Sequence, residues 1–173
     1  MTNNVELTVA ELIAAHFDTW RLLLEYDEDR LDMPSHAMAA TGTLDLESVV
    51  DAIDAFREDL AGKGEVSPHF GNPRGDAVAA ILGNIDQTIF GEPLSRSREE
   101  KAAHLLYFVV KDHPFTDGNK RIGAPLLLFY LAREGMAQPL DPRALTALTL
   151  AIAESAPARK DLMIRLIVNL MAE

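Results

Sequence analysis

The chain has 173 residues, no cysteine and a formal net charge of −11, from 16 basic and 27 acidic side chains. This length suits one compact domain, and the lack of cysteine excludes disulfides, thiolate metal sites and a cysteine nucleophile. The negative charge repels phosphate backbones and anionic lipids, so we expect neither nucleic acid nor a membrane as partner. The N-terminus lacks a signal-peptide pattern and no apolar run could span a bilayer, which predicts a cytoplasmic protein.

Helical periodicity begins near the N-terminus. Thr8 and Glu11 have the spacing of a capping box, which opens a helix to about residue 25. A second apolar helical pattern covers residues 46–60 and ends at two glycines. These two helices make up an N-terminal part, about residues 7–62, of one domain that spans residues 1–173.

The rest of the domain, about residues 70–173, starts with a short helix near Ala77 that stops at Gly83 or Asn84. Residues 85–95 then combine strand-forming side chains with turn chemistry and predict one short β-hairpin.

Four more helices follow the hairpin. Ser97 and Glu100 form a capping box ahead of an apolar helix that Pro114 stops. After a loop to about Asn119, a helix to Arg133 is apolar on nearly every face, so we expect it in the centre of the core. Two last helices end near residues 154 and 171, and the first of them is N-capped by an Asp-Pro pair. The pattern predicts an all-α bundle with one hairpin.

The loop between the two central helices carries the chemistry. Gly118 allows successive backbone N–H groups to point into one concavity, and the next helix directs its positive dipole end there. A histidine ordinarily titrates near pH ~6.5, so a neutral histidine in this loop accepts a proton from an incoming hydroxyl at physiological pH. The residues that we expect to form an anion site are His113, Pro114, Phe115, Asp117, Gly118, Asn119, Lys120 and Arg121. Pro114 restricts how the histidine is presented and Phe115 anchors the loop in the core. Asp117 suits Mg²⁺ beside a polyphosphate, and the two cations and the amide suit phosphate oxygens.

The nine residues His-Pro-Phe-Thr-Asp-Gly-Asn-Lys-Arg, 113–121, resemble the signature of the Fic/Doc family. The similarity continues over residues 74–94, 99–124 and 147–171, which resemble a virulence-related, RhuM-like or death-on-curing-like subgroup. The resemblance implies a Fic-type helical bundle whose hairpin is a flap that holds a target segment by strand-like pairing. The flap would comprise Ile85, Asp86, Gln87, Thr88, Ile89 and Phe90.

By this resemblance the protein transfers a phosphate-containing group from ATP to a hydroxyl side chain of a protein substrate, in a toxin-like or regulatory role. His113 would be the general base and Asp117 would bind Mg²⁺. Gly118, Asn119, Lys120 and Arg121 would cradle the phosphates of the nucleotide. A nucleotide-binding or protein-interaction module with little turnover is the alternative from another class.

Three residues depart from the pattern of AMP-transferring members. Lys120 stands where they commonly carry glycine, and Ala124 stands where they carry a second arginine. Lysine at the first position resembles Doc-like members, which transfer phosphate, so we favour phosphoryl transfer and keep AMP transfer open. Pro125 removes a helical hydrogen bond and implies a kink or an irregular first turn.

The sequence leaves two alternatives for how the activity is controlled. Either an antitoxin or other inhibitory partner restrains the protein, or nothing does. Thr43 and Glu47 have the spacing of the family's inhibitory helix, but Ser48 follows, and we interpret the spacing as coincidental. Outside the loop the simplest interpretations apply. Arg96, Arg98 and Lys101 are expected on a solvated face, and the remaining histidines, His16, His36, His69 and His104, are expected to be surface or packing residues.

Overall fold

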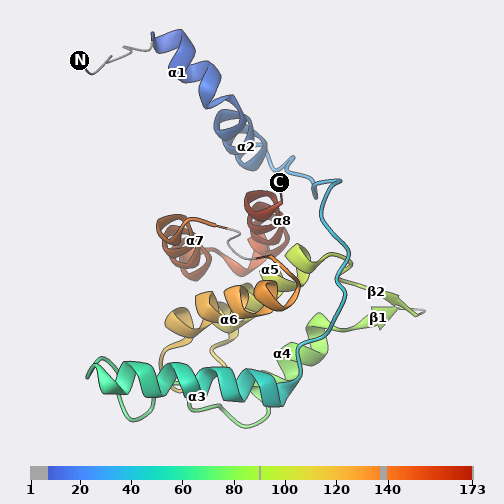
Figure 1. Ribbon diagram of the computed structural model, residues 1–173. Coiled ribbons are helices and arrows are strands. Elements are labelled where there is room, and N and C mark those ends of the chain that lie inside the picture. Colours follow the sequence, from blue (N-terminus) through green and yellow to red (C-terminus); the bar gives the residue numbers. More distant parts are fainter. Residues whose placement is uncertain (1–7, 90, 137–139, 173) are drawn as a thin grey trace. The chain divides into compact units, whose positions relative to one another are not determined.

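The computed structural model describes residues 8–89, 91–136 and 140–172 (Figure 1). The chain divides into two compact units, residues 1–32 and residues 33–173, and each is described by itself. Eight α-helices, one 3₁₀ turn and one two-stranded hairpin make up the described secondary structure, which confirms the predicted all-α class with one hairpin. None of the described helices is both long and apolar enough to cross a membrane.

The first unit contains α1 (Val9–Ala15) and α2 (Phe17–Asp27). The predicted capping box is present, because Thr8 Oγ1 accepts from Glu11 N at 3.3 Å and the Glu11 carboxylate accepts from Thr8 N at 2.8 Å. The prediction of one continuous helix to residue 25 was wrong, since His16 leaves the helical region with φ −114° and ψ 21°. That residue therefore separates two short helices.

In the second unit, α3 (Leu46–Gly62) follows an Asp45 N-cap. The short α4 (Ala77–Ile85) leads to β1 (Thr88–Ile89), which pairs antiparallel with β2 (Glu92–Pro93). The central pair is α5 (Arg98–Asp112) and α6 (Asn119–Arg133). The C-terminal elements are α7 (Pro142–Glu154), the 3₁₀ turn η1 (Pro157–Arg159) and α8 (Lys160–Met171).

The core lies around α5 and α6, which pack closely against each other. A Cβ atom added at Gly123 would lie 3.2 Å from both Leu106 Cδ1 and Val110 Cγ2, so the two helices approach where one of them has no side chain. Leu127 and Leu131 are fully buried, which confirms the central position predicted for their helix. In Figure 1, α3 and α4 lie on one side of this pair and α7 and α8 on the other.

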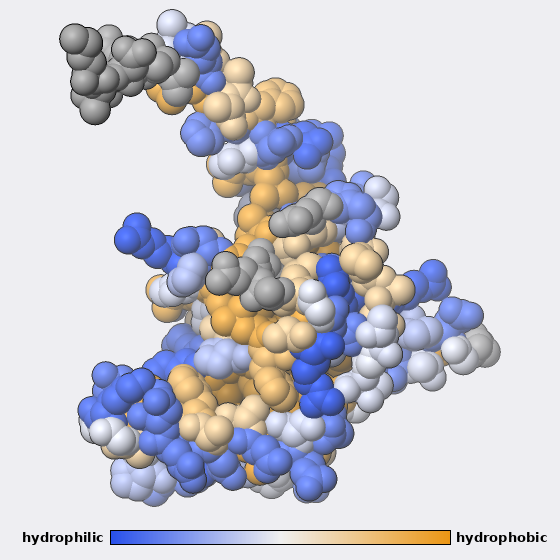
Figure 2. Space-filling model, in the orientation of Figure 1, coloured by the Kyte–Doolittle hydropathy of each residue, from blue (hydrophilic) through white to orange (hydrophobic). Residues whose placement is uncertain are grey.

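Pro125 does not interrupt α6, which is continuous from Asn119 to Arg133. The proline ring lines an apolar hollow between α3 and α6 together with Phe56 and Phe129. Hydrophilic residues cover the outer side of α3 in Figure 2, and hydrophobic surface follows the seam between α3 and α6.

The structure corrects two expectations around the hairpin. The short helix does not stop at Gly83 or Asn84 but continues to Ile85, which is buried. The solvated face predicted for Arg98 and Lys101 was wrong. Lys101 is only 8% exposed and donates from Nζ to Asp86 Oδ1 at 2.6 Å.

Arg98 takes part in a second buried ion pair, with Glu99, which is 1% exposed. The Arg98 guanidinium donates to Glu99 Oε1 at 2.9 Å and to the backbone oxygen of Glu134 at 3.0 Å. Buried charges require such partners, because burying an unpaired charge costs several kcal/mol.

Candidate functional site

Most of the predicted loop residues line one open cavity of about 430 Å³. We call it the loop cavity, and its lining residues are Arg74, His113, Thr116, Asp117, Gly118, Asn119, Lys120 and Arg121. Three of these side chains are cationic and one is anionic, so the cavity is locally positive in a protein whose net charge is −11.

His113 ends α5 and begins the motif loop, residues 113–118. Its backbone is left-handed, with φ 50° and ψ 58°, and its side chain is exposed at the loop cavity. The next two residues are buried, and Phe115 is only 1% exposed. Pro114 and Phe115 therefore hold the loop in the core, and the imidazole is left at the solvent-filled side.

A segment that the sequence did not single out holds the motif loop. This clamp segment, residues 67–74, runs beside the loop and bonds to it along its length. Gly71 N donates to Asp117 O at 3.0 Å, Thr116 N to Asn72 O at 2.9 Å and Arg74 N to Pro114 O at 2.8 Å. The Thr116 hydroxyl adds a bond to His69 O at 2.7 Å. These four hydrogen bonds to the clamp segment hold the motif loop in place.

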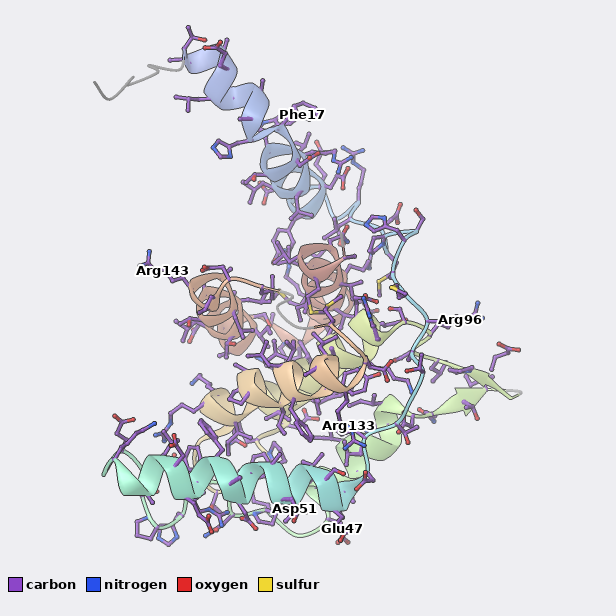
Figure 3. The ribbon with its side chains drawn as sticks, in the orientation of Figure 1. Phe17, Glu47, Asp51, Arg96, Arg133 and Arg143 are labelled. Atoms are coloured by element: carbon purple, nitrogen blue, oxygen red, sulfur yellow. The ribbon has the colours of Figure 1, made fainter. Side chains whose placement is uncertain are left out.

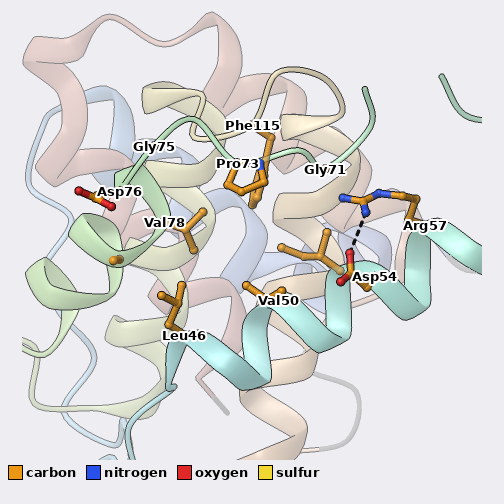
Figure 4. Close-up of a pocket in the computed structure, with 12 residues that line it drawn as sticks. Leu46, Val50, Asp54, Arg57, Gly71, Pro73, Gly75, Asp76, Val78 and Phe115 are labelled. Atoms are coloured by element: carbon orange, nitrogen blue, oxygen red, sulfur yellow. Dashed lines mark hydrogen bonds and ion pairs between the residues drawn. The ribbon is translucent and has the colours of Figure 1, made fainter. Parts of the chain in front are cut away.

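The clamp segment is in turn tied to α3 through Arg57. The Arg57 guanidinium donates to Phe70 O at 2.7 Å and to Asp54 at 2.8 Å (Figure 4). Phe70 is fully buried and packs edge-on against Phe56, with ring centroids 5.7 Å apart.

Gly118 lies directly against the Phe70 ring. Its φ is +89°, and a Cβ atom at this position would lie 2.4 Å from Phe70 Cε2. Both the backbone conformation and the space therefore require glycine. The tight turn leads the chain into α6, whose first residues, Asn119, Lys120 and Arg121, line the loop cavity.

The first amides of α6 are available for a ligand. The N–H groups of Asn119, Lys120 and Arg121 have no acceptor among the described residues, whereas Ile122 N donates to Gly118 O at 2.8 Å. Free amides and the positive dipole end at a helix start favour an anion.

The Asn119 side chain has a different task. Its Oδ1 accepts from Phe115 N at 2.9 Å and its Nδ2 donates to Phe115 O at 3.0 Å. Asn119 therefore closes the turn with its side chain. Its backbone N–H has no acceptor among the described residues and is left for a ligand.

Asp117 and Arg121 form an ion pair at 3.2 Å, one helical turn apart. Ser67 Oγ donates to the other carboxylate oxygen at 2.7 Å. The Ser67 hydroxyl and, secondarily, the Arg121 guanidinium hold the pKa of Asp117 below its ordinary value. Arg121 also lies over the Phe70 ring, with its Cζ 4.9 Å from the centroid. The carboxylate is thus ionised and oriented at the cavity edge.

A Ser67→Ala substitution is expected to raise the pKa of Asp117 toward its ordinary value, because the strongest hydrogen bond to the ionised form is lost. The depressed pKa stabilises the fold above the ordinary carboxylate pKa of ~3.9, and this contribution disappears as pH falls through the folded-state pKa. NMR titration of the Asp117 carboxyl carbon measures the shift.

Ser48→Ala is the matched control, because Ser48 makes the same kind of bond to Asp45 at the start of α3. It should raise the pKa of Asp45 and leave Asp117 unchanged. An unshifted Asp117 in the Ser67→Ala protein would contradict the assigned hydrogen bond.

None of the described residues of the predicted flap lines the loop cavity. Of the residues predicted as a flap, Ile85 belongs to α4 and Asp86 pairs with Lys101. Gln87, Thr88 and Ile89 are described but do not line the loop cavity, and Phe90 lies outside the described residues. The stretch that borders the loop is instead the clamp segment.

A second, apolar cavity of about 150 Å³ lies on the other side of the clamp segment, against α3 and α4 (Figure 4). Gly71, Pro73 and Gly75 line this apolar cavity, whereas Arg74 lines the loop cavity. Arg74 therefore faces a different cavity from its neighbours Pro73 and Gly75.

Thr43 and Glu47 do not build an inhibitory helix at the loop. Thr43 precedes the N-cap of α3, and Figure 3 shows Glu47 on the side of α3 that faces away from α6. Arg57 is the α3 residue that reaches the clamp, and it lies about 15 Å further along the helix at 1.5 Å per residue.

Metal binding by this chain alone has no support among the described residues, where no three His, Asp or Glu side chains cluster around a common point. Asp117 nevertheless fits a magnesium ion that takes its other ligands from phosphate and water, because one carboxylate is sufficient in such sites.

Fold and site together define a helical protein with a histidine, a carboxylate and free helix-start amides around one cavity. Residues 52–131, which include the motif loop, match the sequence model of the Fic/DOC family. Residues 52–131 therefore form a region of the Fic/DOC family type. A search of curated proteins found no match to it.

Proposed function

We propose that this protein transfers a phosphate-containing group from ATP to a hydroxyl of a target protein. The family is in general one of transferases. The observation that carries the proposal is that His113 and the free amides of the α6 start line the same cavity. A base and an anion cradle are thus within reach of one bound substrate.

In the proposed step the target oxygen attacks a phosphorus atom of ATP while the His113 imidazole takes its proton. The leaving group is ADP in phosphoryl transfer and pyrophosphate in AMP transfer, and it carries away the electron pair of the broken P–O bond. The helix-start amides and Lys120 stabilise the negative charge on the phosphate oxygens. Magnesium, held by Asp117, would neutralise charge on the phosphates.

The Asp117–Arg121 ion pair is the observation that favours the second candidate, a nucleotide-binding module with little turnover. It joins the proposed metal ligand to a proposed phosphate ligand at 3.2 Å. When a magnesium nucleotide binds, Asp117 has to turn to the metal and Arg121 to a phosphate. The energy needed to weaken their ion pair opposes binding of the nucleotide. The pair is only partly buried, so solvent screens it and the opposition is small.

The clamp segment is the better candidate for presenting the target hydroxyl, because it borders the motif loop and the hairpin does not. We assign the hairpin no contact with the transferred group. We propose that, if the activity is inhibited, the inhibitor is a separate protein such as an antitoxin.

Incubation with ATP labelled at the α or the γ phosphate, in parallel, with magnesium and cell lysate tests the proposal. Label on protein from the γ position alone means phosphoryl transfer, which we expect because Lys120 resembles Doc-like members and Ala124 replaces the second arginine of AMP-transferring members. Label from the α position means AMP transfer. ATP binding without label from either position, under conditions in which a known Fic enzyme labels its target in the same lysate, would favour the module.

A further inference from the structure

Arg74 is a cation at the loop cavity that lies outside the family motif. It comes from the clamp segment, 39 positions before His113 in the sequence. In the structure it lines the same cavity as the start of α6. Its role therefore depends on which cations of the loop cavity are already engaged by other protein groups.

The three cations of the loop cavity are not equivalent. Arg121 pairs with Asp117, lies over Phe70 and donates to Glu65 O at 3.4 Å. The salt bridges of the described residues include neither Arg74 nor Lys120. Arg74 and Lys120 are thus the cations that are available to an incoming anion.

The backbone of Arg74 is held next to the proposed base. Arg74 N donates to Pro114 O at 2.8 Å, and Pro114 directly follows His113. The neighbouring residues Pro73 and Gly75 line the apolar cavity, whereas Arg74 lines the loop cavity. This placement is fixed by hydrogen bonds of the main chain and does not rely on the long side chain alone.

An exposed arginine is most often a solvated surface charge. Two observations argue against that interpretation here. The backbone of Arg74 is bonded to the residue that follows His113, so its side chain starts beside the proposed base. The cavity collects three cations against one carboxylate because Arg74 enters from the clamp segment.

We propose that Arg74 is a phosphate-binding residue of the site and contacts the phosphate group nearest to His113. This inference rests on the proposed function and deepens it. The planar guanidinium can hold two phosphate oxygens at once, whereas Lys120 supplies a point charge. Arg74 would thereby select for di- and triphosphate ligands and orient the group that is transferred.

Binding measurements on the full chain test the role of Arg74 without relying on turnover. Isothermal titration calorimetry with Mg-ATP, with inorganic tripolyphosphate and with adenosine is compared for wild type, Arg74→Ala and Arg74→Lys. Loss of a hydrogen-bonded charged group costs about 1.5–3 kcal/mol, or about 10- to 100-fold in Kd. We expect Arg74→Ala to weaken ATP and tripolyphosphate binding by at least about 10-fold, Arg74→Lys to recover part of it, and adenosine affinity to stay unchanged.

Arg143→Ala is the matched control. Arg143 is exposed near the start of α7, and Figure 3 shows its side chain extending away from the helices, so ATP affinity should equal that of wild type. Thermal unfolding of each variant shows whether the fold is kept, and it should be, because the Arg74 bond to Pro114 comes from the backbone.

Several outcomes separate this inference from the proposed function. ATP binding by Arg74→Ala equal to wild type, with Lys120→Ala weakened, would overturn the role of Arg74 and leave the proposed function standing. If Arg74→Ala lost as much affinity for adenosine as for ATP, the role of Arg74 would also be overturned, because adenosine has no phosphate. Failure of the wild-type protein to bind ATP or tripolyphosphate would reject both proposals.

Discussion

Replacement of His113 by alanine is expected to abolish labelling of the target protein. His113 is the one imidazole that lines the loop cavity among the described residues, so its loss leaves the attacking hydroxyl without a base. General-base catalysis of this kind contributes about 10²- to 10⁴-fold in rate. Single-turnover labelling with γ-labelled ATP measures the loss.

ATP affinity of the His113→Ala protein should stay close to that of wild type, because the phosphates are assigned to the α6 amides, Lys120 and Arg74. His36→Ala is the control for removal of a histidine, since His36 is exposed and does not line the loop cavity. Undiminished labelling by the His113→Ala protein would refute the assignment of the base.

The second large effect is expected from Gly118→Ala. A left-handed backbone costs a non-glycine residue about 1–2 kcal/mol. The added Cβ would also lie 2.4 and 2.5 Å from atoms of the buried Phe70 ring, and overpacking of this kind costs about 1–3 kcal/mol more. We expect the free energy of unfolding to fall by the sum of these amounts, and ATP binding to be lost because Phe70, the motif loop and Arg121 shift together.

Gly135→Ala separates the two contributions. Gly135 has a similar φ of +80°, but a Cβ atom there would meet nothing within 4 Å. This variant should lose only the backbone part and keep ATP affinity. Urea unfolding and calorimetry measure both quantities. Equal losses of stability in the two variants would show that contact with Phe70 is not what requires glycine at position 118.

Local patterns in the sequence predicted much of the fold. Helix periodicity located α3, α5, α6, α7 and α8, and Pro114 marked the end of α5. The Thr8 capping box and the Asp141 N-cap depend on residues two or three positions apart, which a sequence shows directly. The motif loop was visible for the same reason, because its cavity is lined mainly by consecutive residues.

The places where prediction failed share a physical cause. Lys101 is buried because Asp86 and α4 cover it, and Arg98 because Glu99 and the end of α6 receive its guanidinium. Helical spacing shows which residues share a face but not which neighbours cover that face. The hairpin was predicted at the correct residues, and its role as a flap stays a prediction.

The linear order of residues was enough to identify a family, a helical class and the set of consecutive side chains from His113 to Arg121. Only the tertiary structure showed that a distant extended segment holds this loop. Gly71, Asn72 and Arg74 bond to it through backbone atoms. Such bonds place almost no constraint on side-chain identity, so they leave little trace in a single sequence. The cation that the segment adds to the cavity, Arg74, could therefore be recognised only once the folded chain had brought it beside His113.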